Sequence, residues 1–184
     1  MREQHHEADV HDETRRGRLF LVTGARASGT TAVGAALARS FDRAVAIDAA
    51  VFDQMVVAGQ DPYRGPHQDA HHVPPRAEQL RQLFLRWSAA IATAETYQLE
   101  GFDAVISDTV LGGHLEDFLD LASPETLHVV VLDPGGEGRA AVHDDVGTPR
   151  WGLWVDNSGQ TADETVTTVL VRLAESVVAT DSSA

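Results

Sequence analysis

The chain has 184 residues, of which 43% are hydrophobic, so it is long and apolar enough to form one globular domain with a buried core. Its formal net charge of −14 excludes bulk electrostatic attraction to nucleic acid or to an anionic membrane surface. Cysteine is absent, which excludes disulfide bonds, thiolate nucleophiles and cysteine-ligated zinc. We therefore expect a cytoplasmic protein that acts on a small molecule, with no nucleic-acid or membrane partner and an oligomeric state that the composition leaves open.

The segment before the first apolar run is polar. Residues 1–16 are rich in His and charged side chains and lack the apolar core of a signal peptide. No stretch elsewhere approaches the ~20 apolar residues that are needed to span a bilayer. We expect residues 1–16 to be a disordered lead-in with few contacts, and residues 17–180 to form a single domain.

A phosphate-binding pattern follows the first apolar run. Residues 19–22 predict a buried strand, and a helical pattern covers residues 32–41. Between them, Gly24, four further residues, Gly29, Thr30 and Thr31 have the spacing G-x-x-x-x-G-K-[ST], with Thr30 in the place of the lysine. The glycines allow backbone N–H groups to face an anion at the helix N-terminus, and Thr31 stands where a Mg²⁺-binding hydroxyl is expected.

The loop has no lysine, and no other lysine is available to replace it, because all 14 basic residues of the chain are arginines. We include Arg26 and Ser28 among the candidate ligand residues of the loop, with Arg26 as a partial replacement for the missing charge. A short-chain dehydrogenase is disfavoured, because that class requires a glycine at Ser28 and an active-site lysine. A glycine turn without a ligand remains the alternative to an anion site.

Strand and helix patterns alternate through the rest of the chain. Strands are expected at residues 44–48, 102–108, 127–132 and 152–155, and helices at residues 75–99, 112–121 and 162–178. Thr161 and Glu164 have the spacing of a capping box at the start of the last helix. Alternating strands and helices predict an α/β fold in which helices cover both faces of a parallel sheet.

Five segments together resemble small P-loop kinases, namely chloramphenicol phosphotransferase-like proteins and related AAA-type small-molecule kinases. These segments are GARASGTT, the strand that ends at Asp48, RQLFLRW, FDAVISD and TPRWGLWVDNSGQTADET. The resemblance implies a three-layer sandwich with a five-stranded parallel sheet in the order 2-3-1-4-5. It also implies that ATP binds across the carboxyl ends of the strands.

Two aspartates take catalytic positions by this resemblance. Asp48 ends the second strand, where such kinases place the carboxylate that accepts the proton of the acceptor hydroxyl. Asp108 ends the third strand, where such kinases place a carboxylate that holds Mg²⁺ through water, and Thr31 is the other metal-binding residue that the resemblance implies. The alternatives are a helix cap for Asp48 and a turn-forming role for Asp108.

Two departures from the kinase pattern point to phosphotransfer that is weakened or altered. The first is Thr30, because the loss of one preorganised charge costs a few kcal/mol of transition-state stabilisation. The second is the lid between the fourth and fifth strands, which is reduced to a loop. Arg139 and Arg150 are the only arginines there that can clamp phosphates.

The sequence leaves three functions open. The first is ATP- and Mg²⁺-dependent phosphorylation of a metabolite hydroxyl. The second is a nucleotide-independent cyclase, lyase or isomerase of secondary metabolism that reuses the kinase pocket without a cofactor, with Asp48 and Asp108 as acid and base. The third is a non-catalytic ligand-binding protein. The segment His67–His72 is expected to form a loop of the acceptor pocket or a solvated surface, and a metal site is its alternative.

Overall fold

A computed structural model of the chain describes residues 15–63, 75–135 and 147–179. Residues 1–14 of the expected lead-in 1–16, the segment His67–His72 and Arg139 lie outside the described residues. The described strands are β1 (Leu19–Gly24), β2 (Ala44–Asp48), β3 (Asp103–Ser107), β4 (Leu127–Leu132), β5 (Leu153–Val155) and β6 (Val177–Val178). The described helices are α1 (Thr30–Arg39), α2 (Ala50–Gln54), α3 (Ala77–Leu99), α4 (His114–Ala122), α6 (Ala162–Val171) and the short 3-10 helix η1 (Leu173–Ser176).

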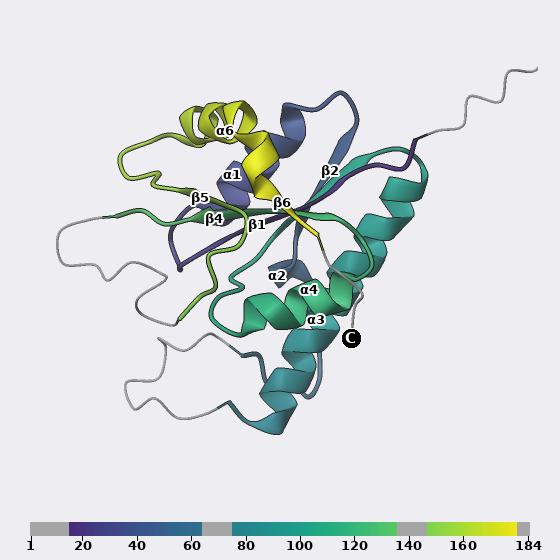
Figure 1. Cartoon of the computed structure of the whole chain (residues 1–184). Helices are drawn as coiled ribbons and strands as arrows, with labels where there is room; N and C mark the ends of the chain where they lie inside the picture. Colours follow the sequence, from purple (N-terminus) through teal and green to yellow (C-terminus); the bar gives the residue numbers. More distant parts are fainter. Residues whose placement is uncertain (1–14, 64–74, 136–146, 180–184) are drawn as a thin grey trace, which may run out of the picture.

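The sheet has the predicted order β2-β3-β1-β4-β5, with these five strands parallel (Figure 1). β1 lies at the centre, where Leu21 is opposite Ile106 of β3 and Val129 of β4. Every residue of β1 is buried, because helices cover both faces of the sheet there. The carboxyl ends of β1, β2 and β3 lie at one edge of the sheet. The loop of residues 24–31, which we call the phosphate loop, therefore lies at the same edge as Asp48 and Asp108.

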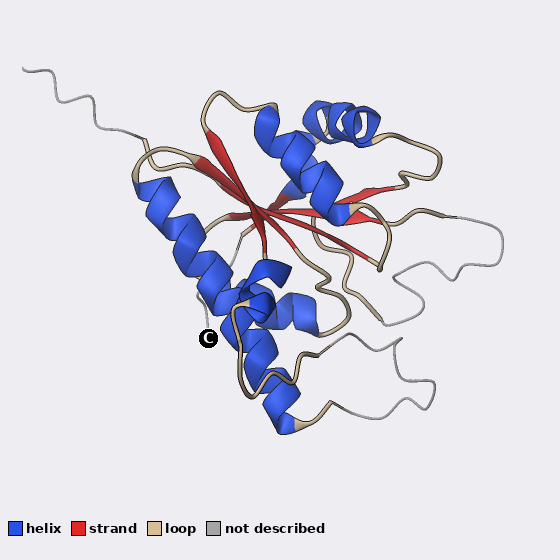
Figure 2. Ribbon diagram, turned by 180° about the vertical axis from the view of Figure 1, so that it is seen from behind, coloured by secondary structure: helices blue, strands red, loops and turns tan. Residues whose placement is uncertain are grey.

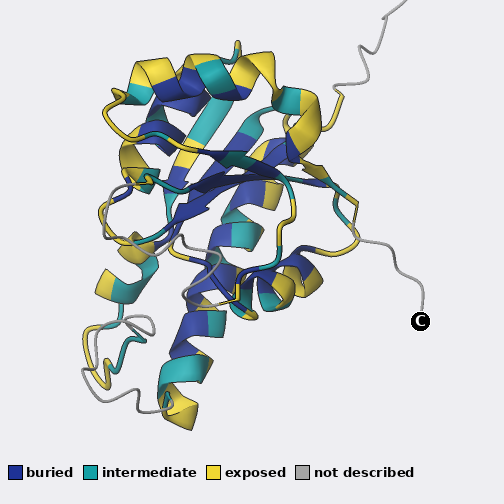
Figure 3. Ribbon diagram, turned by 60° about the vertical axis from the view of Figure 1, so that its left-hand side comes forward, coloured by how far each residue is buried: buried dark blue, intermediate teal, exposed yellow. Residues whose placement is uncertain are grey.

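Helices pack on the two faces as separate layers (Figure 2). α1 and α6 cover one face, where Leu37 and Val166 pack against side chains of β1 and β4. α3 and α4 cover the other face, and α2 lies beside them. Figure 3 shows the buried strands between helices whose outer surfaces are exposed. The three-layer α/β sandwich predicted from the sequence is confirmed.

The long helix α3 is amphipathic, and its buried stripe decides how it packs. Leu83, Trp87, Ala90 and Ala94 recur at intervals of three or four residues and are fully or almost fully buried. Trp87 meets Phe118 of α4 at a ring-centroid distance of 5.7 Å. Burial of a side chain of this size stabilises the fold by about 3–5 kcal/mol relative to alanine.

The C-terminal region differs from the prediction. The capping box of Thr161 and Glu164 is present, but α6 ends at Val171 rather than at residue 178. After η1, Val177 and Val178 form the antiparallel strand β6 on the edge of β4. Periodicity cannot separate helix from strand in so short an apolar run, and here pairing with a free strand edge prevails. The helix α2 is also an addition to the predicted elements.

Two charged side chains hold the amino-terminal edge of the sheet. Arg18 donates its backbone N–H and two guanidinium N–H groups to the carboxylate of Asp103. Burial alone would raise the pKa of Asp103, but the hydrogen bonds and charge of Arg18 lower it below its ordinary value of 3.8. His128 stacks on Phe20 nearby, and burial and the charge of Arg18 lower its pKa below 6.5. Among the described residues, no helix combines the length and apolar character needed to cross a bilayer.

Candidate functional site

The phosphate loop occupies the strand-to-helix turn that the sequence predicts. β1 ends at Gly24 and α1 begins at Thr30. A Cβ on Gly24 would lie 2.5 Å from the carbonyl oxygen of Leu132 and 2.5 Å from Ser28 Oγ, so that glycine is required there. Gly29 caps α1 at a φ of 90°, which glycine adopts readily. The loop thus brings its backbone close to Ser28 Oγ and directs the first free N–H groups of α1 outward.

One loop residue adopts a conformation that is costly for its side chain. Ala27 has a φ of 65°, in the left-handed region, and it is exposed. This conformation costs an alanine about 1–2 kcal/mol relative to the right-handed region. The rest of the loop, including the hydrogen bond from the backbone N–H of Ser28 to the carbonyl of Ala25 (3.0 Å), compensates for that cost. Strain of this kind concentrates at ligand-binding loops.

The N-terminus of α1 has the electrostatics of an anion site. Its first turn contains no acidic residue, and the helix dipole places partial positive charge there. Thr30 is half-buried, whereas Thr31 and Arg26 are exposed. These three side chains are the candidate ligands of the loop, and Arg26 is the one cation among the described residues 24–31.

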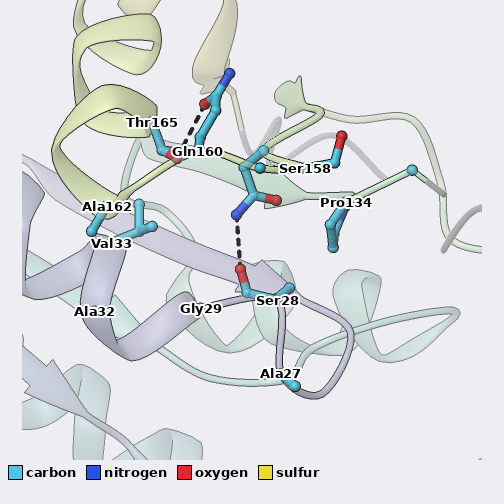
Figure 4. A pocket seen from close by; sticks show the side chains of 13 residues that line it. Ala27, Ser28, Gly29, Ala32, Val33, Pro134, Ser158, Gln160, Ala162 and Thr165 are labelled. Atoms are coloured by element: carbon cyan, nitrogen blue, oxygen red, sulfur yellow. Dashed lines mark hydrogen bonds between the residues drawn. The ribbon is translucent and has the colours of Figure 1, made fainter.

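A pocket of about 560 Å³ opens beside this loop (Figure 4). Its walls come from the loop and α1, from the residues that follow β4, from the segment that joins β5 to α6, and from the start of α6. The lining residues are Ala27, Ser28, Gly29, Ala32, Val33, Pro134, Gly135, Asn157, Ser158, Gly159, Gln160, Ala162 and Thr165. Its volume lies within the range of small-molecule and cofactor sites.

Two buried polar atoms of the pocket residues have no hydrogen-bond partner in the described part of the chain. They are Ser28 Oγ and Asn157 Oδ1. The amide nitrogen of Asn157 donates to the backbone carbonyl of Ser28 at 2.9 Å, which ties the β5–α6 segment to the loop. Buried polar atoms are normally satisfied by protein, water or ligand. Both residues line the pocket, although the two atoms themselves have almost no exposed surface.

Asp48 ends β2 at the carboxyl edge of the sheet, as predicted. It is paired in register with Ser107 at the end of β3 and is half-buried. Its Oδ1 accepts a hydrogen bond from the backbone N–H of Ala50 at 3.1 Å. The cap-like contact that was the alternative interpretation is thus present, and β3 lies between the strand that carries Asp48 and the strand that carries the phosphate loop.

Asp108 is held inside the protein. Its Oδ2 accepts from Trp87 Nε1 at 2.8 Å and lies 3.0 Å from Arg86 Nη2, while its Oδ1 accepts the backbone N–H of Thr109 at 2.8 Å. Burial raises the pKa of Asp108, and the guanidinium of Arg86 opposes this shift. Arg86 also binds Asp53 of α2 through Nη1 at 2.6 Å. We call the group Asp53, Arg86 and Asp108 the carboxylate clamp.

Oδ2 of Asp108 does not fit direct coordination of a Mg²⁺ ion in this arrangement. Mg²⁺ requires oxygen ligands at 2.0–2.1 Å in octahedral geometry and retains several waters. The side chain of Asp108 is only 7% exposed, and its Oδ2 already contacts a cation and an indole N–H. Thr31, the other predicted metal ligand, is exposed at the first turn of α1. The described residues contain no group of three or more metal-ligating side chains.

Sequence reasoning missed an aromatic group beside the clamp. The ring of His114, at the start of α4, lies 5.4 Å from that of Tyr63 and 5.8 Å from that of Trp87. His114 Nδ1 lies 3.0 Å from Asp117 Oδ2. Burial raises the pKa of Tyr63. The sequence signal that could have located this group is Arg86, an arginine next to Trp87 of the apolar stripe in the predicted helix.

Arg150 lies apart from the phosphate loop. Its guanidinium stacks over the ring of Trp154 at 5.0 Å. It lines a second pocket of about 580 Å³, which shares no residue with the first. Trp151 lines the same second pocket, so the structure does not bring either residue to the loop.

Comparisons with known proteins are informative at the level of structure. An APS kinase from Mycobacterium tuberculosis in complex with AMPPNP and APS has a TM-score of 0.60 and 14% sequence identity, over 86% of this chain and 98% of that chain. A sugar kinase from Janibacter sp. HTCC2649 has a TM-score of 0.57 and 14% identity, over 86% and 95% of the two chains. A gluconokinase from Sinorhizobium meliloti 1021 has a TM-score of 0.52 and 22% identity, over 88% and 95%.

The chain has the fold of the P-loop kinases. No family model and no curated protein matches the sequence. The predicted kinase-like scaffold is confirmed by the strand order and by these neighbours. At identities this low the likeness concerns the fold, so the activity of this kinase-fold chain has to be inferred from its own residues.

Proposed function

We propose that this kinase-fold chain is a small-molecule phosphotransferase that binds ATP through the backbone of its phosphate loop and transfers phosphate to a metabolite hydroxyl. The pocket of about 560 Å³ carries the proposal. It adjoins both the anion site at the N-terminus of α1 and the two unsatisfied polar atoms, Ser28 Oγ and Asn157 Oδ1. A nucleotide has matching parts: phosphates for the loop and a nucleobase N–H donor for the asparagine.

Different residues of the pocket bind different parts of the nucleotide. The backbone N–H groups of Thr30 and Thr31 face the phosphates, because the first turn of a helix leaves its N–H groups without internal partners. The nucleoside occupies the space between Ala32 of α1 and Gln160. Gln160 Oε1 accepts from Thr165 Oγ1 at 3.2 Å, which orients its amide group.

On the acceptor side, Asp48 is the proton acceptor for the hydroxyl that attacks the terminal phosphate. It lies at the carboxyl edge of the sheet, one strand from β3 and two from the phosphate loop. Phosphoryl transfer depends mainly on positioning and charge neutralisation. With Thr30 in place of lysine, we expect turnover to be slow relative to kinases that retain that charge.

A nucleotide-independent enzyme is the second candidate, and one observation favours it. Arg26 is the only cation among the described residues of the loop, and it is exposed, so the phosphates receive little charge compensation. The third possibility, a protein that binds the nucleotide without catalysis, would retain the same pocket. Nucleotide binding separates the nucleotide-independent enzyme from the other two candidates.

Calorimetry with ADP and ATP tests the proposal. We expect binding to the wild-type chain that is abolished by Ala32→Tyr, because Ala32 is exposed on α1 and lines the pocket, where a tyrosine ring would occupy the nucleoside space. Ala77→Tyr, at an exposed first-turn position of α3, is the matched control and should bind as the wild type does. Absence of binding to wild-type protein, or equal binding by both variants, would contradict the proposal.

A further inference from the structure

The carboxylate clamp links three elements that surround the acceptor side. Arg86 comes from the buried face of α3, Asp53 from α2, and Asp108 from the end of β3. The side chains of Arg86, Asp53 and Asp108 are 10%, 19% and 7% exposed, so water screens their interactions weakly. A buried ion pair loses several kcal/mol when one partner is removed. The clamp therefore holds α2 and α3 against the sheet.

The same contacts compete with any metal at Asp108. To coordinate a divalent cation through Oδ2, Asp108 would have to release the guanidinium of Arg86 and the indole of Trp87 from that oxygen. Arg86 would then remain buried with Asp53 alone, and the indole N–H would lose its partner. Each loss costs free energy, because unpaired polar groups in the interior are expensive. The clamp therefore disfavours direct coordination of a metal by Oδ2 of Asp108.

We propose that Asp108 is a structural anchor and that nucleotide binding places no divalent cation on it. This inference rests on the proposed function, because it concerns how the nucleotide is bound. The cation that contacts the carboxylate directly after β3 is the guanidinium of Arg86, from helix α3. Divalent cations then act on the nucleotide and not on this carboxylate.

The first test compares the dissociation constant of ADP in excess EDTA with that in saturating Mg²⁺, by calorimetry, for wild type and for Asp108→Asn. We expect the ratio of the two constants to agree between the proteins within about twofold, since a site that does not hold the metal has no coupling to it. Asp120→Asn, on the exposed side of α4, is the matched control. A ratio that falls by about fivefold or more in Asp108→Asn alone would overturn the inference, because that is the size of a real coupling.

The second test is measured on the wild-type protein, and a variant serves only to assign the resonance. The indole N–H of Trp87, assigned by its loss in Trp87→Phe, reports on the hydrogen bond to Asp108 in the NMR spectrum of the wild-type protein. We expect this resonance to keep its position in Mg²⁺ alone and in Mg²⁺ with ADP. A large shift in either condition means that the metal has displaced the indole, and this outcome overturns the inference.

The two proposals fail in distinguishable ways. If ADP binds only with Mg²⁺ and Asp108→Asn removes that requirement, the inference is wrong and the proposed function stands. If ADP binds in neither buffer, the proposed function is wrong, and the Trp87 resonance in Mg²⁺ alone then decides whether Asp108 takes a metal.

Discussion

The proposed nucleotide side and acceptor side of the site differ in whether their polar side chains have hydrogen-bond partners in the protein. Beside the phosphate loop, Ser28 Oγ and Asn157 Oδ1 are buried without partners, next to an open pocket. At the ends of β2 and β3, the carboxylates of Asp48 and Asp108 already accept hydrogen bonds from the protein, and the one buried atom of the carboxylate clamp without a partner among the described residues is Arg86 Nε. Unsatisfied groups indicate a place kept for a ligand, whereas satisfied groups indicate a role in stability. The first region therefore supports binding more strongly than the second supports catalysis.

The largest expected effect comes from breaking the carboxylate clamp. Arg86→Met leaves Asp53 and Asp108 without their shared cation, and we expect the free energy of unfolding to fall by about 3–5 kcal/mol. Urea denaturation measures this loss. Arg81→Met is the control, because Arg81 is exposed on the same helix and lies 3.7 Å from Glu78, so that its loss should cost less than about 1 kcal/mol. Equal stability of the two variants would show that the clamp is not a structural device.

The acceptor side is tested by Asp48→Asn, which keeps the shape and the hydrogen bond from Ala50 but removes the basic oxygen. We expect turnover to fall by about 10²–10⁴-fold, the usual contribution of a general base. Release of ADP from ATP with a panel of hydroxyl acceptors measures it. Asp42→Asn, an exposed residue before β2, should leave turnover unchanged. A variant that unfolds, or one that stays active, would identify Asp48 as a helix cap.

The variant Thr30→Lys tests whether the phosphate loop binds the phosphates of a nucleotide. A lysine next to Thr31 restores the cation of the loop pattern, and a hydrogen bond to a charged group contributes about 1.5–3 kcal/mol, so ADP should bind at least about tenfold more tightly. Thr167→Lys adds the same charge on the exposed face of α6 and controls for the overall charge of the chain. If both variants gain equally, the loop no longer has kinase geometry.

The smallest expected effect is a pH dependence at the edge of the sheet that is remote from both sides. Because the pKa of His128 is lowered in the folded state, the unfolded chain takes up the proton first, and stability falls as the pH drops below about 6.5. Arg18 and Asp103 face this ring, and the stabilisation from Asp103 is lost only at lower pH, since its folded pKa lies below 3.8. The midpoints of urea denaturation of wild type and His128→Gln, measured between pH 7 and 5, separate the contribution of His128 from that of Asp103. A wild-type midpoint as insensitive to pH as that of the variant would contradict the assignment.

The sequence predicted those features that local patterns determine. The strand–loop–helix at Gly24, the capping box at Thr161 and the strand order follow from spacing, from backbone geometry and from the resemblance to P-loop kinases. It also placed Asp48 and Asp108 at the carboxyl edge of the sheet. The periodicity of α3 predicted a buried face that contains Trp87.

The remaining features depend on contacts between distant residues. Nothing in the sequence around Asp108 shows that Arg86, 22 positions earlier, approaches it, because that contact depends on how α3 crosses the sheet. Strand β6 pairs with Leu127 and His128 of β4, which the short strand β5 does not reach, and a local pattern cannot reveal this. Arg150 was grouped with the phosphate loop by its place in the chain, but packing directs it over Trp154.

The most direct test of nucleotide binding at the phosphate loop is an NMR titration of the wild-type chain with ADP, followed at the backbone amides. We predict that the N–H resonances of Gly29, Thr30 and Thr31 shift strongly, because these groups face the phosphates, while that of Arg18 at the opposite edge of the sheet stays in place. Shifts confined to other parts of the chain, or none at all, would contradict the claim that this loop binds the nucleotide.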